Sequence, residues 1–404
     1  SFCRCHDFAA HSRAMRLALL THEPFYPPSG GGSTEANYLV IELTRRSHEV
    51  HLFCPDFPDR DTVAKRFGIT VHPFTGWEMG RYTRLRSLKY LAYPGVLRRL
   101  VRRIARDISF DAILSQHAIS AVAAGKLKTD LGVPVVMNFL DFLTGFMESW
   151  PAWTMPRFLL RRLMAYELSL PKRHNADAVL TVSDELARRF AETGYAADRL
   201  HPVHYGYDAK LFQLKTGNRK PGTVVMHGSF DTHHLGPIAI RTITDIALDR
   251  PETHFLFIGR ETDAVKNLTK RVLTAAPSAK LECTGFVPYG EVAKRLGQAG
   301  IGIIPYESSS GTHCAFVAKL VEYAALGLPV VITPLAGVKA FFGDEPSVRF
   351  SAFDGEQFAG DVLGVLDNPP PRTESERLAK RVAAELDWPV ICARAVDQLE
   401  AVVS

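Results

Sequence analysis

Two charged residues in the second half of the chain are spaced for binding a phosphate-linked nucleoside. Lys319 and Glu322 lie three residues apart in CAFVAKLVEYAALGLPVVIT, which predicts a helix followed at once by a buried strand. Residues at this spacing share one face of a helix. Lys319 could reach a pyrophosphate, and Glu322 could accept hydrogen bonds from both hydroxyls of a ribose. The alternative is an exposed ion pair worth about 0.2–0.5 kcal/mol. Ligand binding is favoured because the pair heads toward the carboxyl end of a strand, where open α/β sheets bind ligands.

A glycine-rich loop near the start of the chain is a second candidate for phosphate binding. Gly30, Gly31 and Gly32 follow the first predicted strand and precede a helix predicted to open at Ser33. Glycines let backbone N–H groups approach a phosphate, and a helix N-terminus adds partial positive charge. The loop does not match GxGxxG, and no acidic residue follows a second strand as in dinucleotide-binding proteins. The alternative is an ordinary loop capped by Ser33.

Length and composition restrict the class of protein. The 404 residues suffice for two domains of ordinary size. The 46% hydrophobic and 23% charged residues are typical of globular rather than disordered chains. A net charge of +5 is too small to indicate a nucleic acid partner, and no apolar run reaches the roughly 18 residues of a membrane span. Residues 1–14 lack the apolar core of a signal peptide, so we expect a leader or cloning remnant, with Met15 as the natural start.

Neither cysteines nor acidic pairs indicate a metal. The six cysteines form no CxxC pair or zinc-like cluster, which favours reduced thiols in a cytoplasmic protein. No loop carries a DxD-like pair where Mg²⁺ would be expected, since Asp56 and Asp59 are too loosely placed. We therefore expect no cofactor and no obligatory metal.

The secondary-structure pattern predicts two parallel sheets covered by helices on both faces. Short β-branched runs alternate with helical stretches, which is typical of this α/β class. The polar segment Thr216–Gly222 separates the two series and is the predicted linker. The expected strands are Arg16–Thr21, Glu49–Phe53, Ile69–His72, Ala112–Ser115, Pro134–Asn138, Ala178–Val182, Thr223–His227, His254–Ile258, Leu281–Thr284, Gly300–Ile304 and Pro329–Thr333, with helices that include Ser33–Arg46, Gly236–Ala247 and Phe316–Leu326.

The segment KLVEYAALGLPVV resembles the donor-binding signature of glycosyltransferase family 4 and its relatives with the GT-B fold. Further segments resemble that family in the same order: residues 177–212, HGSF at 227–230, FIGR at 257–260, TGFVPYGEVAKRL at 284–296 and AGIGIIPY at 299–306. The resemblance therefore spans nearly the whole chain from Met15. It implies two Rossmann-like, doubly wound parallel-sheet domains facing across a cleft. Residues 15–215 would form the acceptor-side domain and residues 216–385 the nucleotide-sugar domain. Residues 386–404 would form a helix that packs back on the N-terminal domain.

The resemblance also assigns roles to individual residues. Gly31 and Gly32 would lie near the donor phosphates, Glu322 would bind the ribose and Lys319 would contact the pyrophosphate. Gly228 and Ser229, in HGSF, would belong to the same donor site. His117, in the SQH stretch after the fourth strand, stands where the family often has a histidine facing the donor sugar.

Two departures from the family pattern bear on the mechanism. Cys314 stands where many members have a first, sugar-facing glutamate. The usual Arg and Lys pair after the first strand of the second domain is also missing, and the loop GSFDTHHLGP offers His233 and His234, which could replace that charge if protonated. The alternative for each histidine is a surface loop residue. Both departures weaken the case for a retaining mechanism.

An inverting enzyme would need a general base to deprotonate the acceptor hydroxyl. Asp141 is the candidate, because it follows the strand VPVVMNFL and so lies at a strand's carboxyl end. The alternative for Asp141 is a helix N-cap. His117 is the second candidate base.

Two basic amphipathic stretches, residues 81–106 and 157–174, lie in the predicted acceptor-side domain. In the first, apolar residues fall on one helix side and Arg98, Arg99, Arg102 and Arg103 on the other. Such helices, with Trp150 and Trp153 nearby, can bind an anionic membrane surface. The acceptor would then be anionic, lipid-linked or both. The alternative is that the arginines are merely solvated.

These features together predict an enzyme that transfers a hexose-type sugar from a UDP- or GDP-sugar to a glycan or lipid-linked acceptor. We expect a role in cell-surface polysaccharide or glycoconjugate biosynthesis, in the cytoplasm or at the inner face of the plasma membrane. The alternative is a catalytically silent GT-B protein that binds nucleotide or glycan as a partner or regulator. An NAD-dependent Rossmann protein is disfavoured because neither half carries the dinucleotide fingerprint.

Overall fold

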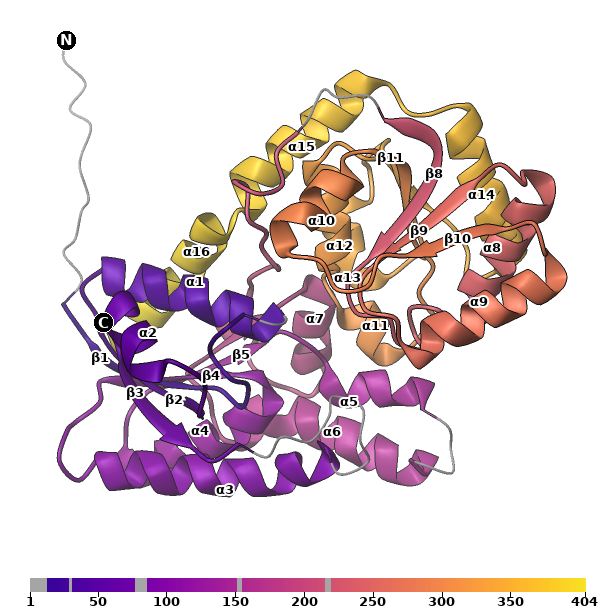
Figure 1. Ribbon diagram of the computed structural model, residues 1–404. Helices are drawn as coiled ribbons and strands as arrows, with labels where there is room; N and C mark the ends of the chain where they lie inside the picture. Colours follow the sequence, from indigo (N-terminus) through magenta and orange to yellow (C-terminus); the bar gives the residue numbers. More distant parts are fainter. Residues whose placement is uncertain (1–12, 29–30, 77–85, 151–154, 215–218) are drawn as a thin grey trace, which may run out of the picture. The chain divides into compact units, whose positions relative to one another are not determined.

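The computed structural model describes residues 13–28, 31–76, 86–150, 155–214 and 219–404, with side chains of 86–89 left aside (Figure 1). Most of the predicted leader, residues 81–85 of the first basic stretch, and Trp153 therefore lie outside the described residues. Two sheets organise the chain, and the connections between their neighbouring strands are mostly helical.

The first sheet has seven strands in the order β3-β2-β1-β4-β5-β6-β7. Parallel pairing joins β1 to β2 and to β4, β2 to β3, and β4 to β5. The strands are β1 (Arg16–Leu20), β2 (Glu49–Pro55), β3 (Thr70–Phe74), β4 (Ala112–Gln116), β5 (Val135–Phe139), β6 (Ala178–Thr181) and β7 (Leu200–Pro202). The helical elements are α1 (Gly31–Arg45), α2 (Arg60–Phe67), α3 (Arg86–Ile104), α4 (His117–Leu131), α5 (Leu143–Phe146), η1 (Met147–Ser149), α6 (Arg157–Arg173), α7 (Asp184–Glu192) and η2 (Ala197–Arg199).

The second sheet has six strands in the order β10-β9-β8-β11-β12-β13. These strands are β8 (Lys220–His227), β9 (His254–Ile258), β10 (Lys280–Cys283), β11 (Ala299–Ile304), β12 (Val330–Ile332) and β13 (Val348–Phe350). The helices are α8 (Pro237–Asp249), α9 (Asp263–Ala275), α10 (Tyr289–Leu296), α11 (Ser310–Cys314), α12 (Ala318–Ala325), α13 (Ala336–Phe342), α14 (Gly355–Asp367), α15 (Arg372–Leu386) and α16 (Trp388–Val403). In both sheets the strand order reverses beside the first strand, as in doubly wound folds.

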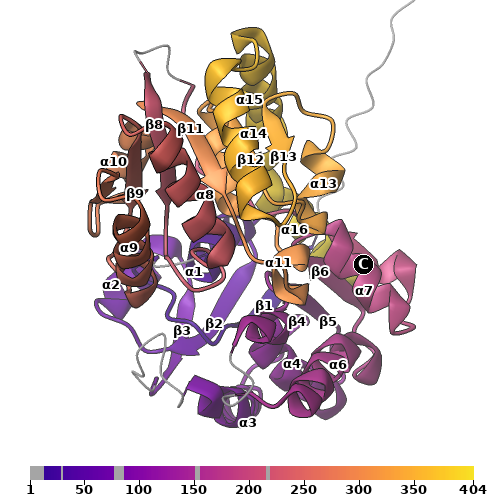
Figure 2. The ribbon, with the colours of Figure 1, turned by 90° about the vertical axis from the view of Figure 1, so that its right-hand side faces the viewer.

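The core of the second sheet follows from its apolar strands. Phe255, Phe257 and Ile301 are at most 2% exposed, because parallel strands are covered on both faces. α8 and α14 pack together beside this sheet, and their apolar residues join the same buried cluster (Figure 2). The prediction of doubly wound parallel sheets is confirmed.

Several predicted boundaries are wrong in detail. α1 begins at Gly31 rather than Ser33, so Gly31 and Gly32 belong to its first turn, while Gly30 lies outside the described residues. The predicted helix Phe316–Leu326 begins only at Ala318, after the separate short helix α11. Lys220–Gly222, predicted as linker, opens strand β8. The sequence analysis did not predict strands β7 and β13. Each has only three residues, which is too short to give a periodic signal in the sequence.

The described chain divides into two compact units. The first unit comprises residues within 1–138, 170–179 and 392–404, and the second comprises 139–169 and 180–391. The predicted domains are consecutive stretches, as the two sheets are, whereas these units interleave along the chain. The predicted boundaries near residues 215 and 385 stay predictions.

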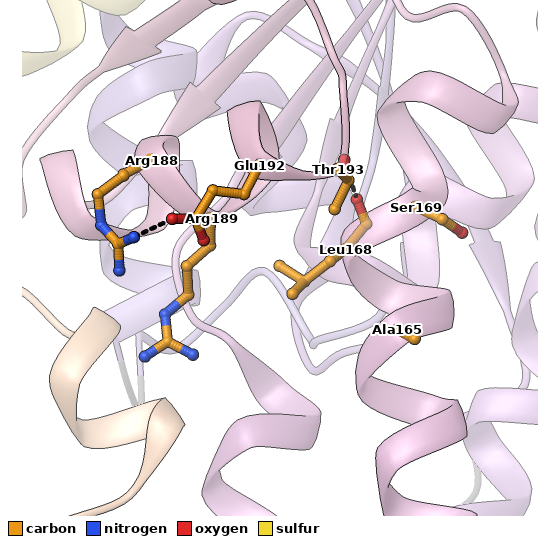
Figure 3. Close-up of a pocket in the computed structure, with 7 residues that line it drawn as sticks. All are labelled: Ala165, Leu168, Ser169, Arg188, Arg189, Glu192 and Thr193. Carbon is orange, nitrogen blue, oxygen red and sulfur yellow. Dashed lines mark hydrogen bonds and ion pairs between the residues drawn. The ribbon is translucent and has the colours of Figure 1, made fainter.

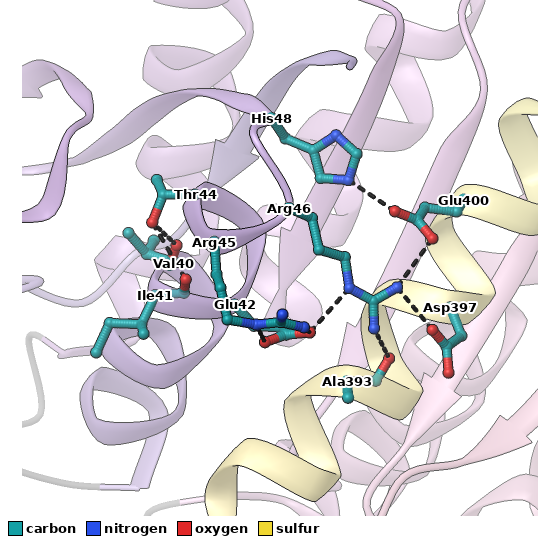
Figure 4. Close-up of polar contacts among 10 residues, drawn as sticks. All are labelled: Val40, Ile41, Glu42, Thr44, Arg45, Arg46, His48, Ala393, Asp397 and Glu400. Atoms are coloured by element: carbon teal, nitrogen blue, oxygen red, sulfur yellow. Dashed lines mark hydrogen bonds and ion pairs between the residues drawn. The ribbon is translucent and has the colours of Figure 1, made fainter. Parts of the chain in front are cut away.

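Within the first unit, the last turns of α16 are tied to the end of α1. Arg46 donates hydrogen bonds to Asp397 (2.7 Å) and Glu400 (2.9 Å), and His48 Nε2 lies 2.9 Å from the other Glu400 oxygen (Figure 4). Glu42 on α1 also accepts from Arg46 at 2.8 Å. Because the Arg46 side chain is only 18% exposed, this network is better shielded from water than an ordinary surface ion pair.

Candidate functional site

Glu322 lies in a buried network. Glu322 lies on α12, in the second unit, and the residue is only 5% exposed. The Tyr289 hydroxyl donates to one carboxylate oxygen, and His227 Nε2 contacts the other. His227 Nδ1 in turn lies 3.1 Å from the Tyr323 hydroxyl. The alternative of an exposed Lys–Glu pair is therefore wrong for Glu322, because its partners come from β8 and α10.

Lys319 extends to the loop that follows β8. Its ammonium donates a 2.7 Å hydrogen bond to the Tyr306 hydroxyl and lies 5.3 Å from the centroid of that ring. Gly228 has φ +103°, in the left-handed region that favours glycine, and a Cβ atom there would lie 2.9 Å from Lys319 Cε. Within the described part of the chain, Lys319 forms no ion pair. This cation is therefore available to an anionic ligand. Ser229, the next residue, is exposed.

His233 and His234 follow in the same loop. Their rings lie 3.9 Å apart, and His234 is 7% exposed, with Nδ1 accepting the Asp231 backbone N–H at 3.1 Å. Burial lowers the pKa of His233 to about 4 and that of His234 well below its ordinary value. The Lys319 charge adds to both effects. Burial therefore opposes a positive charge on either histidine, and a contact of these residues with the donor stays a prediction. His234 is also not a surface residue.

The same loop contains a group of residues that could hold a metal. Asp231, His233 and His234 each offer a ligand atom within 4.8 Å of the others. However, His234 Nδ1 already accepts a backbone N–H, and the Lys319 charge lies close enough to lower the pKa of both imidazoles. Both features oppose a cation, so the expectation of no obligatory metal stays a prediction.

Cys314 cannot replace the missing glutamate. Its thiol is fully buried, which raises its pKa to about 12 and keeps it protonated. Its backbone carbonyl accepts a 2.6 Å hydrogen bond from the Ser183 hydroxyl. Another acid reaches α11: the Glu148 carboxylate accepts the backbone N–H of Ser310. Cys314 and Ser310, on α11, are therefore engaged in packing and in hydrogen bonds within the protein.

In the first unit, the glycine-rich turn packs against His117. A Cβ atom at Gly32 would lie 2.4 Å from His117 Nε2 and 2.6 Å from Glu23 Oε2, so a larger residue would force these side chains to shift. His117 is the first residue of α4 and has φ +65°, an uncommon conformation for a histidine. Such strained positions are concentrated at functional sites. Gly31, at the start of α1, is half-buried.

A buried carboxylate, Glu35, holds this arrangement together. Gln116 donates to it at 2.5 Å and to the Gly32 carbonyl at 2.9 Å, and Asn138 donates to its other oxygen at 2.8 Å. Burial raises the pKa of Glu35 to about 7, although both amide donors oppose the rise. The sequence analysis missed Glu35. Glu35 lies four residues before Leu39 and eight before Leu43, so it shares the buried face of α1 with them. This helical spacing could have indicated from the sequence that the Glu35 side chain is buried.

Asp141 lies half-buried between β5 and α5. The N-cap position of α5 belongs to Phe142, so the N-cap alternative is wrong. The following segment is fixed by Glu167, whose carboxylate accepts the backbone N–H groups of Leu143 (3.0 Å) and Thr144 (2.8 Å). Asp141 therefore precedes a well-anchored turn at the end of a strand.

A pocket of about 580 Å³ lies between α6 and α7, and none of the predicted catalytic or donor-binding residues lines it (Figure 3). Its lining includes Arg188, Arg189 and Glu192. Both arginines pair with Glu185, and Arg188 also pairs with Glu192. The positive charge is thus already neutralised, so the pocket is a weak candidate for an anionic ligand.

The basic helices carry exposed apolar residues as well as arginines. On α3, Leu91 is 81% exposed, while Arg98 pairs with Asp130 at 2.6 Å. On α6, Phe158 is 61% and Leu159 is 41% exposed. Among the described residues, no helix combines the length and hydrophobicity required to cross a membrane.

Family models match most of the chain. Residues 30–206 match the glycosyl transferase 4-like domain, and residues 221–368 match glycosyl transferases group 1. The chain belongs to this family and is a glycosyltransferase of the GT-B class. The resemblance to glycosyltransferase family 4 that was inferred from the sequence is confirmed.

Curated relatives and solved structures agree with this assignment. The chain is 23% identical to a GDP-mannose-dependent alpha-mannosyltransferase of Mycolicibacterium smegmatis, over 96% of this chain and 98% of that one. It is 23% identical to D-inositol 3-phosphate glycosyltransferase 1 of Catenulispora acidiphila, over 98% and 96%. Its fold is similar to HepE of Anabaena in complex with UDP (TM-score 0.71, 15% identity, 96% and 100% coverage). It is also similar to sucrose-phosphate synthase of Thermosynechococcus elongatus (TM-score 0.78, 14% identity, 96% and 98% coverage).

Proposed function

We propose that this glycosyltransferase takes its sugar from a nucleoside-diphosphate donor that binds at α12 and the loop after β8. The observation that carries the proposal is the Lys319 ammonium, which lies beside Gly228 and donates a hydrogen bond to the Tyr306 phenol. Glu322, three residues on, is an acceptor suited to ribose hydroxyls. The proposed donor-binding residues of the second unit are Gly228, Ser229, His233, His234, Lys319 and Glu322. For Gly31 and Gly32, in the first unit, donor binding stays a prediction from the family resemblance.

The chemistry of the leaving group supports these roles. A departing nucleoside diphosphate needs its negative charge stabilised, and fixed donors and cations do this well in a site shielded from water. Lys319 supplies a full charge, and the neutral imidazoles of His233 and His234 could each donate one N–H. The mannosyltransferase relative is named for GDP-mannose and the HepE structure contains UDP, which supports a GDP- or UDP-sugar.

The test is a thermal-shift series with UDP, GDP and their sugars. A ligand that binds only the folded protein raises the melting temperature by mass action. We expect a shift with at least one nucleoside diphosphate, and its loss in Glu322→Ala. Glu291→Ala is the matched control, because Glu291 lies on the exposed part of α10 and its ion-pair partner among the described residues is the exposed Lys294. The proposal is contradicted if neither UDP, GDP nor their sugars stabilise the wild type.

For the transfer step, the proposed general base is Asp141, with His117 as the second candidate. Asp141→Asn should abolish sugar transfer while the nucleotide-induced thermal shift persists, because the amide cannot take up the proton. A loss of the shift as well would mean that Asp141 supports the fold or donor binding instead. Product stereochemistry from the native enzyme would then decide between inversion and retention.

The proposed acceptor is a glycan or lipid-linked glycan, used in cell-surface polysaccharide or glycoconjugate biosynthesis at the inner face of the plasma membrane. The basic helices with exposed Leu91, Phe158 and Leu159 support docking on anionic lipid. Liposome flotation tests this: we expect binding that requires acidic lipid and is lost in a variant with Arg99, Arg102 and Arg103 changed to Glu. All three arginines are exposed, and Arg98 is left unchanged because it pairs closely with Asp130, which lies 3.8 Å from Arg102. Absence of native binding would remove the membrane role.

The catalytically silent alternative is not favoured by the relatives, which are named as enzymes. Slow release of UDP or GDP from a sugar donor would support the enzyme. Donor binding without hydrolysis or transfer to any acceptor would support the silent protein.

A further inference from the structure

Both carboxylate oxygens of Glu322 already have hydrogen-bonding partners within the protein. The Tyr289 hydroxyl donates to Oε1, and His227 Nε2 contacts Oε2. A carboxyl group that is 5% exposed needs such partners, because a buried polar group without them would cost free energy. A ribose diol that approaches Glu322 must therefore compete with groups of the protein itself.

Of the two partners of Glu322, Tyr289 is the one whose side chain can move away from the carboxylate. It is the first residue of α10, and about 45% of its surface is exposed although its hydroxyl meets the buried Glu322. Its ring packs edge-on against Phe212 with centroids 5.0 Å apart. His227, by contrast, is 5% exposed within strand β8 and is held on its other side by Tyr323.

The backbone around Tyr289 allows this movement. Gly285 lies before it and Gly290 immediately after it, and the space where each would carry a Cβ atom is open. Gly285 also has φ +70°, in the left-handed region that favours glycine. Phe286, between Gly285 and Tyr289, is 73% exposed. The turn before α10 is therefore lightly packed compared with the Glu322 side of the network.

We propose that the Tyr289 hydroxyl occupies the position of a nucleoside sugar hydroxyl on Glu322 when the site is empty, and gives it up when the donor binds. This inference rests on the proposed role of Glu322 in ribose binding. The phenol keeps the buried carboxylate hydrogen-bonded in the free enzyme, at the cost of competing with the ligand. Tyr289 thus sets the affinity for nucleotides that carry ribose hydroxyls.

The test compares nucleotide affinities of the wild type and Tyr289→Phe by calorimetry with UDP and GDP. Loss of the competing hydroxyl should tighten binding roughly three- to tenfold. The free variant should melt at a lower temperature, because Glu322 loses a donor, so the nucleotide-induced thermal shift should grow. Tyr166→Phe is the protein control: it removes a phenol on α6, outside the Glu322 network, and should leave affinity unchanged.

A ligand control isolates the hydroxyl. The 2′,3′-dideoxy forms of the same diphosphates cannot donate to Glu322, so wild type and Tyr289→Phe should bind them equally. If Tyr289 instead contacts the ligand, Tyr289→Phe will bind UDP or GDP more weakly. Weaker or unchanged binding, with a normal wild-type response that Glu322→Ala abolishes, overturns this inference alone. Absence of any wild-type response to nucleotides overturns the proposed function together with it.

Discussion

Two regions of this protein share one local packing arrangement but place different chemical groups in it. In each, a glycine after the first strand of a sheet packs against a functional side chain. Gly32 meets His117 Nε2 and Gly228 meets Lys319 Cε, at 2.4 Å and 2.9 Å from the positions of their absent Cβ atoms. The first unit places an imidazole there, whereas the second places a full positive charge.

Each region also contains a buried glutamate, and the partners of these two acids differ. Glu35 is held by the amides of Gln116 and Asn138, which donate but do not titrate. Glu322 is held by a phenol and an imidazole, one of them partly exposed. The difference suggests that Glu35 fixes a scaffold, whereas Glu322 is kept ready to exchange partners.

The largest expected effect concerns Glu35 and pH. Its pKa is about 7 in the folded protein and near 4.5 without burial, so the folded state binds more protons between these values. Stability should therefore fall as pH rises from about 4.5 through 7, by up to the order of 3 kcal/mol for this group. Urea unfolding at pH 5 and pH 8 measures this. Glu35→Gln should flatten the dependence, leaving the part due to Glu167, whose pKa is also raised to about 7. Equal slopes for wild type and variant would contradict the scaffold role.

The second prediction compares the two glutamates directly. Glu322→Gln should weaken nucleotide binding roughly tenfold, because an amide offers one acceptor oxygen where the carboxylate offers two. Glu35→Gln should change that affinity by less than about twofold. Calorimetric titration with UDP or GDP gives both values. If Glu35→Gln weakens binding as much as Glu322→Gln does, the distinction between scaffold and ligand group is lost.

The third prediction concerns the glycines. Gly32→Ala should destabilise the protein by about 1–3 kcal/mol, because its Cβ would overlap His117 and Glu23. Gly95→Ala on α3 is the control. No heavy atom lies within 4 Å of its added Cβ, so it should be neutral or stabilising by up to about 1 kcal/mol. Chemical denaturation measures both. Equal effects at the two sites would show that close packing at His117 is unimportant.

The smallest expected effect separates the phosphate and ribose contacts. Lys319→Met should weaken binding of a nucleoside diphosphate roughly five- to tenfold while leaving the nucleoside itself unaffected, because only the diphosphate carries the charge that Lys319 would meet. Lys294→Met, on the exposed face of α10, is the control. Equal losses for nucleoside and diphosphate would place Lys319 elsewhere in the site.

The sequence by itself determined the fold class and the family. Alternating buried strands and helices specify doubly wound parallel sheets, because such strands must be apolar on both faces. The spacing of Lys319 and Glu322 on one helix, and the glycines after the first strand of each sheet, were also evident. These are local patterns, and local patterns can be read along one chain.

Only the tertiary structure decided what those residues meet. Tyr289 and His227 reach Glu322 from 33 and 95 positions away in the chain. Gln116 donates a hydrogen bond to Glu35 from 81 positions away in the chain. Burial, which keeps His233 and His234 neutral and Cys314 protonated, likewise depends on distant segments. Protonation and partner choice follow from the desolvation and proximity that folding creates, and no spacing along the sequence encodes either.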